Sequence, residues 1–211
     1  MMLYGFSGLG ADKRVFKYLN LDAELIAVEW IQPLKDESIE EYAKRLSESI
    51  DQSSDYGFLG VSFGGLIAVE LSKILDPKIT ILISSVETKN DLRYLYRKLG
   101  NSNLLKVVPS KIIKPPKAIA QFLFGAENTA LLDQIIQDTD PIFLKWALNQ
   151  LLKWQNKSRH KNCYKIHGTN DKLIPLPKDD STFKVEGGGH FMIVDRADEV
   201  SAAINKILKM N

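Results

Sequence analysis

A glycine-rich stretch lies between an apolar segment and a helical pattern, and it reads Leu59-Gly60-Val61-Ser62-Phe63-Gly64-Gly65. Residues 55–59 are typical of a strand and residues 66–75 of a helix. A strand that enters a tight turn before a helix presents the turn residue at the carboxyl edge of a sheet. Glycines on both sides remove Cβ atoms that would collide with neighbouring backbone. The stretch therefore marks Ser62 as a candidate nucleophile; the alternative is a glycine-rich turn carrying a surface serine.

Strand and helix patterns alternate along the first 85 residues. Strands are expected at 2–6, 25–30, 55–59 and 79–84, and helices at 11–19, 38–50 and 66–75. Ser38 and Glu41 form the pattern of a capping box at the start of the second helix. The strand at 79–84 is continuously apolar, as in strands buried on both faces of a parallel sheet. This alternation predicts an α/β fold with a mostly parallel sheet flanked by helices.

The pattern changes between residues 86 and 160. Helical segments follow one another at 90–99, 110–124, 126–137 and 141–154. Strand patterns resume at 162–167 and 181–185, and a helix is expected at 197–209. We therefore expect a core formed by residues 1–85 and 161–211, with residues 86–160 inserted as a helical cap.

Composition narrows the setting in which this chain works. The net charge of +2 gives no argument for binding nucleic acid or a membrane surface. The apolar run at 79–83 is too short to span a bilayer, so no membrane insertion is expected. Cys163 is the only cysteine, which excludes an internal disulfide and favours a reducing, cytoplasmic compartment. The N-terminus lacks the pattern of a signal peptide. The sequence does not indicate an oligomeric state.

A serine nucleophile needs a base, and three histidines are available. His160 lies in the basic run 157–161 and is expected at the surface. His167 ends a strand, where a structural role is the simpler interpretation. His190 follows three glycines at the end of the last strand, on a loop that can bend toward the centre of the sheet. His190 is therefore the predicted base.

The base in turn needs a carboxylate to orient it. Asp171 follows the strand at 162–167 after a short turn, at the same edge of the sheet. Glu87, just after the strand at 79–84, is the alternative acid. Asp195 is close to His190 in sequence, but a helix start there favours capping. The order Ser62, Asp171, His190 differs from the orders of the chymotrypsin and subtilisin triads.

With these residues in place, the chain resembles the α/β-hydrolase superfamily over nearly its whole length. The matching stretches are residues 3–8, 60–65, 166–175 and 188–191. The resemblance implies a sheet of about six strands that lacks the first strands of larger relatives, with residues 86–160 in the place of a cap domain. It also implies an oxyanion hole made by the backbone N–H groups of Phe6 and Phe63. Tyr4 stands where relatives usually carry a histidine.

The sequence thus predicts a serine hydrolase that cleaves a carboxylic ester or thioester of a small, largely apolar acyl substrate through an acyl-enzyme on Ser62. No metal or organic cofactor is needed, and the expected partner is a small-molecule substrate. Acyl transfer, carbon–carbon bond hydrolysis or lyase chemistry on the same triad stay open, as does a non-catalytic small-molecule-binding homologue. The expected substrate contacts are Ser7, Leu9, Phe122, Phe143 and Trp146, although aromatic residues at helical spacing are more often simple core.

Overall fold

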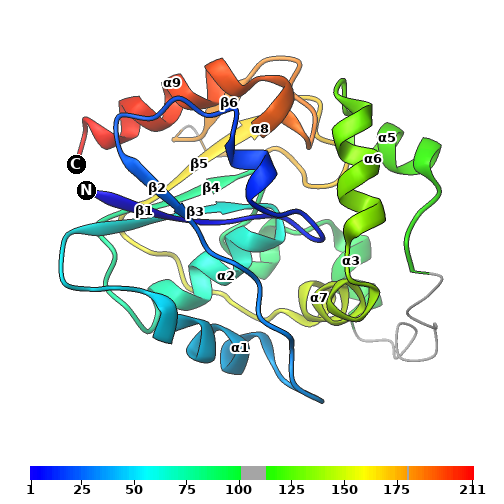
Figure 1. Cartoon of the computed structure of the whole chain (residues 1–211), viewed down its shortest axis with the longest axis horizontal. Coiled ribbons are helices and arrows are strands. Elements are labelled where there is room, and N and C mark those ends of the chain that lie inside the picture. The colour runs from blue at the N-terminus through cyan, green and yellow to red at the C-terminus, as the bar shows by residue number, and fades with distance from the viewer. Residues whose placement is uncertain (101–112, 180) are drawn as a thin grey trace.

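Six strands form one sheet in the order β2-β1-β3-β4-β5-β6, and every neighbouring pair is parallel (Figure 1). The structure is a computed structural model that describes residues 1–100, 113–179 and 181–211. The strands are β1 (Met2–Phe6), β2 (Glu24–Ala27), β3 (Tyr56–Val61), β4 (Thr80–Ile83), β5 (Cys163–Gly168) and β6 (Phe183–Val185). The predicted α/β class and the number of strands are confirmed.

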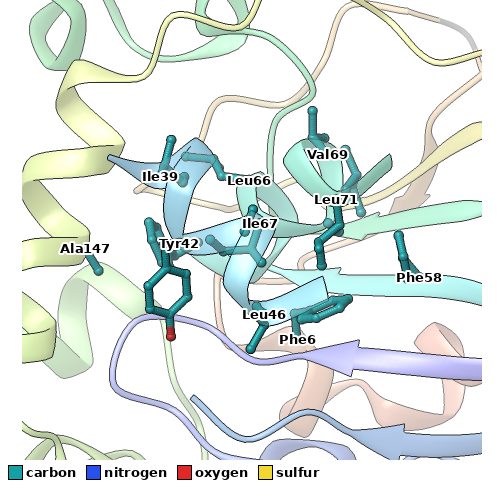
Figure 2. Close-up of a cluster of buried hydrophobic side chains, with 14 of the residues drawn as sticks. Phe6, Ile39, Tyr42, Leu46, Phe58, Leu66, Ile67, Val69, Leu71 and Ala147 are labelled. Carbon is teal, nitrogen blue, oxygen red and sulfur yellow. The ribbon is translucent and has the colours of Figure 1, made fainter. Parts of the chain in front are cut away.

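Helices cover both faces of the sheet (Figure 1). Helices α1 (Ile39–Leu46) and α2 (Phe63–Ser72) cover one face, and α8 (Met192–Asp195) and α9 (Ala197–Leu208) cover the other. Figure 2 shows the cluster on the first face, where Ile39, Tyr42 and Leu46 of α1 lie close to α2. Helix α2 is buried from Phe63 to Leu71, which fixes the turn before it firmly in the core.

The segment from 86 to 160, called the helical insertion below, lies between β4 and β5 in the chain. Its described helices are α3 (Tyr94–Leu99), α5 (Lys117–Phe124), α6 (Thr129–Asp138) and α7 (Pro141–Lys153). Helices α5, α6 and α7 lie together beside the carboxyl ends of the strands (Figure 1). The division into a core and a separate cap domain stays a prediction. None of the described helices combines the length and apolar character needed to cross a bilayer.

Several expected elements are shorter in the structure. The helix expected at 11–19 is only a 3₁₀ turn, Lys13–Phe16, because Asp12 caps it and the chain must soon enter β2. The helix expected at 90–99 begins at Tyr94, after a separate 3₁₀ turn at Lys89–Asp91. The helix expected at 110–124 begins at Lys117, directly after two prolines. Residues 110–112 of that prediction lie outside the described residues.

A buried carboxylate joins the two ends of the helical insertion. Glu87, just after β4, accepts hydrogen bonds from Arg159 Nη1 at 2.8 Å and from the backbone N–H of His160 at 2.7 Å. Its carbonyl accepts one from Asn156 Nδ2 at 2.7 Å. Lys165 Nζ on β5 lies 3.5 Å from the same carboxylate. Glu87 therefore fastens the base of the helical insertion to the sheet.

Candidate active site

The turn between β3 and α2 holds Ser62 in an unusual backbone conformation, with φ 52° and ψ −119°. A positive φ is costly for a residue with a side chain, so neighbouring contacts must hold it. The Ser62 N–H donates to the carbonyl of Ile83 at 2.9 Å, and its own carbonyl accepts from Ser85 Oγ at 2.6 Å. The end of β4 thus supports the candidate nucleophile.

Close packing explains the glycines around Ser62. A Cβ on Gly60 would lie 2.5 Å from the Cα of Gly65. A Cβ on Gly64 would overlap the carbonyl oxygens of Phe6 and Ser7. The loop after β1 therefore lies directly against the turn that carries the serine.

Ser62, His190 and Asp171 form one continuous chain of hydrogen bonds. Ser62 Oγ lies 2.9 Å from His190 Nε2, and His190 Nδ1 lies 2.8 Å from Asp171 Oδ2. His190 and Asp171 are only 5% and 8% exposed, whereas Ser62 is partly exposed. With Nδ1 protonated and donating to the carboxylate, Nε2 is free to accept the serine proton. The structure brings together all three residues that the sequence singled out.

Asp171 is held by the segment that follows it. Its Oδ1 accepts the backbone N–H groups of Leu173 at 2.8 Å and Ile174 at 2.9 Å. Burial alone would raise the pKa of this carboxyl, but the charge of His190 and the hydrogen bonds from His190 and Ile174 together bring the pKa below its ordinary value. The acid is therefore ionised at neutral pH.

A second histidine lies beside Asp171, which the sequence analysis did not anticipate. His167, at the end of β5, is fully buried, and its Nε2 lies 3.2 Å from the Ile174 carbonyl and 3.5 Å from Asp171 Oδ2. Burial is the main cause that lowers the pKa of His167, outweighing the charge of Asp171. The ring is therefore neutral at pH 7. In the sequence, the spacing of four residues between His167 and Asp171 was the signal that could have indicated this contact.

The other sequence candidates have structural partners. Asp195 accepts the backbone N–H groups of Glu127 and Asn128, so it holds the chain before α6 instead of capping its own helix. The Tyr4 hydroxyl exchanges two hydrogen bonds with the backbone of Asp51. Glu87 is committed to the base of the helical insertion, and Asp171 alone of the two acids contacts His190.

An apolar cavity of about 370 Å³ opens onto Ser62 and His190. Its walls are mostly aliphatic, from the loop after β1, from the segment after Asp171 and from the helical insertion. The lining from α6 and α7 comprises Leu132, Ile135, Ile136, Leu144, Leu148, Leu151 and Leu152. Leu9 lines the cavity, as expected. Thr139 and Tyr96 add hydroxyl groups, but that of Thr139 donates to the carbonyls of Gly10 and Ile135.

The structure does not bring the other four expected contacts to this cavity. Ser7 lies in the loop after β1, where its hydroxyl donates to Ala11 and accepts from Trp30 Nε1. Phe122 is 65% exposed. Phe143 and Trp146 turn toward the core. They pack there against the rings of Trp30, Tyr42 and Phe63. The apolar wall instead comes from leucines and isoleucines of α6 and from leucines on another side of α7.

The expected oxyanion donors lie on either side of the nucleophile. Phe63 follows Ser62 and begins α2. Phe6 ends β1, and the carbonyl oxygen of Phe6 lies close to Gly64. A Cβ on Gly8 would lie 3.3 Å from the Cβ of Ser62, so the loop after Phe6 borders the reacting hydroxyl. The role of the two N–H groups stays a prediction.

Several solved structures are similar in fold to this chain. Neither protein-family models nor curated proteins give a match to this sequence. A thermophilic esterase from Thermogutta terrifontis with malate bound matches with a TM-score of 0.74 at 14% identity, over 100% of this chain and 90% of that one. ClbQ from the colibactin NRPS/PKS pathway matches with a TM-score of 0.64 at 18% identity, over 99% and 97%. The RedJ thioesterase from the prodiginine biosynthetic pathway in Streptomyces coelicolor matches with a TM-score of 0.65 at 14% identity, over 98% and 85%. The sheet order and these likenesses establish that the chain has the α/β-hydrolase fold.

Proposed function

We propose that the protein is a serine hydrolase that cleaves an ester or thioester with a largely apolar acyl group, through an acyl-enzyme on Ser62. The observation that carries this proposal is the hydrogen-bonded chain from Asp171 through His190 to Ser62, which opens onto an apolar cavity. An activated serine and a water-poor acyl pocket are the two parts that this chemistry requires.

In the proposed reaction, His190 Nε2 accepts the Ser62 proton while Oγ attacks the acyl carbonyl carbon. The N–H groups of Phe6 and Phe63 hold the developing oxyanion, and losing one such donor typically costs about 3 kcal/mol in barrier height. His190 then gives its proton to the leaving alcohol or thiol. A water molecule, deprotonated by His190, releases the acid and restores Ser62.

The structural neighbours are compatible with this chemistry. They include thermophilic esterases and a thioesterase, so both oxygen and sulfur leaving groups are reasonable candidates. The same triad also serves acyl transfer, carbon–carbon bond hydrolysis and lyase reactions. The aligned Asp171–His190–Ser62 chain counts against a binding protein that has lost its chemistry.

Turnover of a panel of substrates tests the proposal. The panel consists of p-nitrophenyl esters and acyl coenzyme A thioesters with acyl chains of increasing length. Wild-type protein should hydrolyse part of the panel, and Ser62→Ala should abolish that hydrolysis. A fluorophosphonate should form a covalent adduct on wild-type protein and not on Ser62→Ala. Full turnover by Ser62→Ala would remove Ser62 from the mechanism.

A further inference from the structure

Two arginines differ from the others in their charge pairing. The side chains of Arg14, Arg45, Arg159 and Arg196 each form an ion pair with a carboxylate. Within the described part of the chain, neither Arg93 nor Arg97 has a carboxylate within 4.0 Å. Both belong to the α3 region of the helical insertion, Arg93 directly before the helix and Arg97 within it. No carboxylate of the described residues therefore neutralises these two charges.

Arg93 is held next to the triad acid by its own hydrogen bonds. Its Nε donates to the Leu173 carbonyl at 3.0 Å, and its Nη2 lies 3.5 Å from the carbonyl oxygen of Asp171. The side chain is otherwise exposed. These contacts with neutral carbonyls orient the guanidinium, and its other N–H groups have no acceptor among residues 1–100, 113–179 and 181–211.

A second cation, Lys172, lies on the same part of the surface as Arg93. Lys172 Nζ donates to the Phe122 carbonyl at 3.0 Å and lies 3.6 Å from the centre of the Phe122 ring. Among described residues, Lys172 also has no carboxylate within 4.0 Å. The exposed ring of Phe122, which the sequence suggested as a substrate contact, thus orients this lysine.

Arg93 and Lys172 both line a surface hollow of about 520 Å³. The rest of its lining is the segment 169–171 together with three glycines, at positions 125, 187 and 189. The Asp171 carboxylate is turned inward to His190, with a fully buried side chain. Glu186 approaches Thr169 but does not line the hollow. The side-chain charge that faces the hollow is therefore positive.

The hollow adjoins the catalytic cavity through shared segments. Residues 124, 173 and 190 line the cavity, and their neighbours at 125, 172 and 189 line the hollow. Tyr96 also lines the cavity, three residues after Arg93 in the chain. Burial is the main cause that raises the pKa of Tyr96, so its hydroxyl stays protonated and can donate a hydrogen bond.

We infer that Arg93 and Lys172 bind a phosphate on the leaving group, so that the preferred substrate is a thioester of a phosphorylated thiol. This inference rests on the proposed function. The apolar acyl chain occupies the cavity, and the phosphate-bearing arm reaches the adjoining hollow. A guanidinium offers two parallel N–H donors to phosphate oxygens, and an ammonium adds a point charge. Coenzyme A and a phosphopantetheine arm on a carrier protein both present this chemistry.

The bond changes are those of thioester hydrolysis. Ser62 Oγ forms a bond to the acyl carbon, the carbon–sulfur bond breaks, and the sulfur takes the proton that His190 received from Ser62. Water then adds to the acyl carbon, the bond between that carbon and Ser62 Oγ breaks, the proton from water passes through His190 to Oγ, and the carboxylic acid leaves. No oxidant, reductant or metal enters these steps.

Three thioesters with one acyl group test the inference: those of coenzyme A, of phosphopantetheine, and of N-acetylcysteamine, which has no phosphate. We expect Arg93→Gln and Lys172→Gln each to raise KM about two- to fivefold for the phosphorylated substrates, because an exposed ion pair contributes up to about 1 kcal/mol. KM for the N-acetylcysteamine thioester and kcat for all three should not change. Arg93→Lys should restore part of the effect, and added salt should weaken it.

Lys44→Gln is the matched control, because Lys44 is an exposed cation on α1. A raised KM for the coenzyme A thioester alone assigns the contact to the nucleotide phosphates of coenzyme A. A raised KM for both the coenzyme A and the phosphopantetheine thioester assigns the contact to the phosphate that the two share. The inference is wrong if Arg93→Gln leaves KM unchanged for both phosphorylated thioesters. It is also wrong if Arg93→Gln lowers kcat on all three thioesters alike. Those results leave the proposed function intact, whereas wild-type failure on every ester and thioester would overturn that function first. Calorimetry of coenzyme A with Ser62→Ala protein, with and without Arg93→Gln, gives a readout that needs no turnover.

Discussion

The ring of Phe124 packs edge-on against the ring of His190, with centroids 5.3 Å apart and an interplanar angle of 78°. The Phe124 carbonyl also accepts the backbone N–H of Phe191 at 3.1 Å. Phe124 is the last residue of α5, so the helical insertion contacts the ring of the predicted base and the backbone of the residue that follows it. The position of α5 and the orientation of His190 are therefore coupled.

Phe124→Ala should reduce kcat more than it changes KM for short substrates, because the imidazole loses the ring that holds it. A small displacement of a catalytic group can cost up to about 100-fold in rate. Phe124→Leu keeps part of the packing and should keep most of the activity. Steady-state kinetics with a short ester measures this, and an unchanged kcat in Phe124→Ala would show that the contact has no orienting role.

Asp171→Asn and Glu87→Gln should have opposite consequences. The first removes the charge that orients His190 and should lower kcat by about 10⁴-fold with little loss of fold. The second removes the buried charge that pairs with the half-exposed Arg159 and should cost about 1–3 kcal/mol of unfolding free energy while activity is kept. Kinetics and urea unfolding on both variants separate the roles. Loss of activity in folded Glu87→Gln protein would instead make Glu87 the acid.

His167 makes a testable contribution to the pH dependence of stability. Because burial lowers its pKa below the ordinary value of 6.5, the unfolded chain binds a proton there more readily than the folded protein. The wild type should therefore lose stability through this residue as pH falls below about 6.5. Asp171 behaves differently: its lowered pKa confines its loss of stability to pH values below about 4.

His167→Asn removes that titration. The difference in unfolding free energy between wild type and His167→Asn should be larger at pH 7.5 than at pH 5.5, as measured by urea unfolding at both values. His160→Asn is a useful comparison, since it replaces a histidine beside the base of the helical insertion. A stability difference for His167→Asn that does not change with pH would contradict a neutral buried imidazole.

Leu148 on α7 lines the cavity beside Ser62, so a larger side chain at this position should shorten the acyl chain that the proposed pocket accepts. Leu148→Trp should lower kcat/KM for long-chain esters by more than tenfold, since one methylene in an apolar pocket contributes about 1–3 kcal/mol. Short-chain esters should be hydrolysed as before. Ile142→Trp is the control, because Ile142 lies on the same helix and is mostly exposed. Equal loss at every chain length would argue that this cavity does not hold the acyl group.

The sheet and the triad were predictable because both depend on local patterns. Apolar strands, each followed by a turn, bring Ser62, Asp171 and His190 to one edge whatever the details of packing. The structure adds supports that these patterns do not specify. His167 contacts Asp171 through the local turn after β5, whereas the contact of Phe124 with His190 requires α5 to dock on the last loop.

The cavity wall was harder to predict because α7 is apolar on two faces. Phe143 and Trp146 pack against Trp30 and Tyr42, which come from segments about 100 residues away in the chain. Leucines on the other face of the helix line the cavity. Helical periodicity shows that both faces are apolar, but only the aromatic partners decide which face meets the core.

The pairing of β4 with β5 has a consequence for the order in which the chain folds during synthesis. Ile83 pairs with Ile166, so one edge of a fully buried strand has no partner until the whole helical insertion has been made. Parallel strands joined through long connections form late, and unpaired apolar edges promote aggregation. The contacts that hold the turn at Ser62 come from β4 and the residue pair after it, which precede the helical insertion in the chain, whereas Asp171 and His190 join Ser62 only when β5 and β6 complete the sheet.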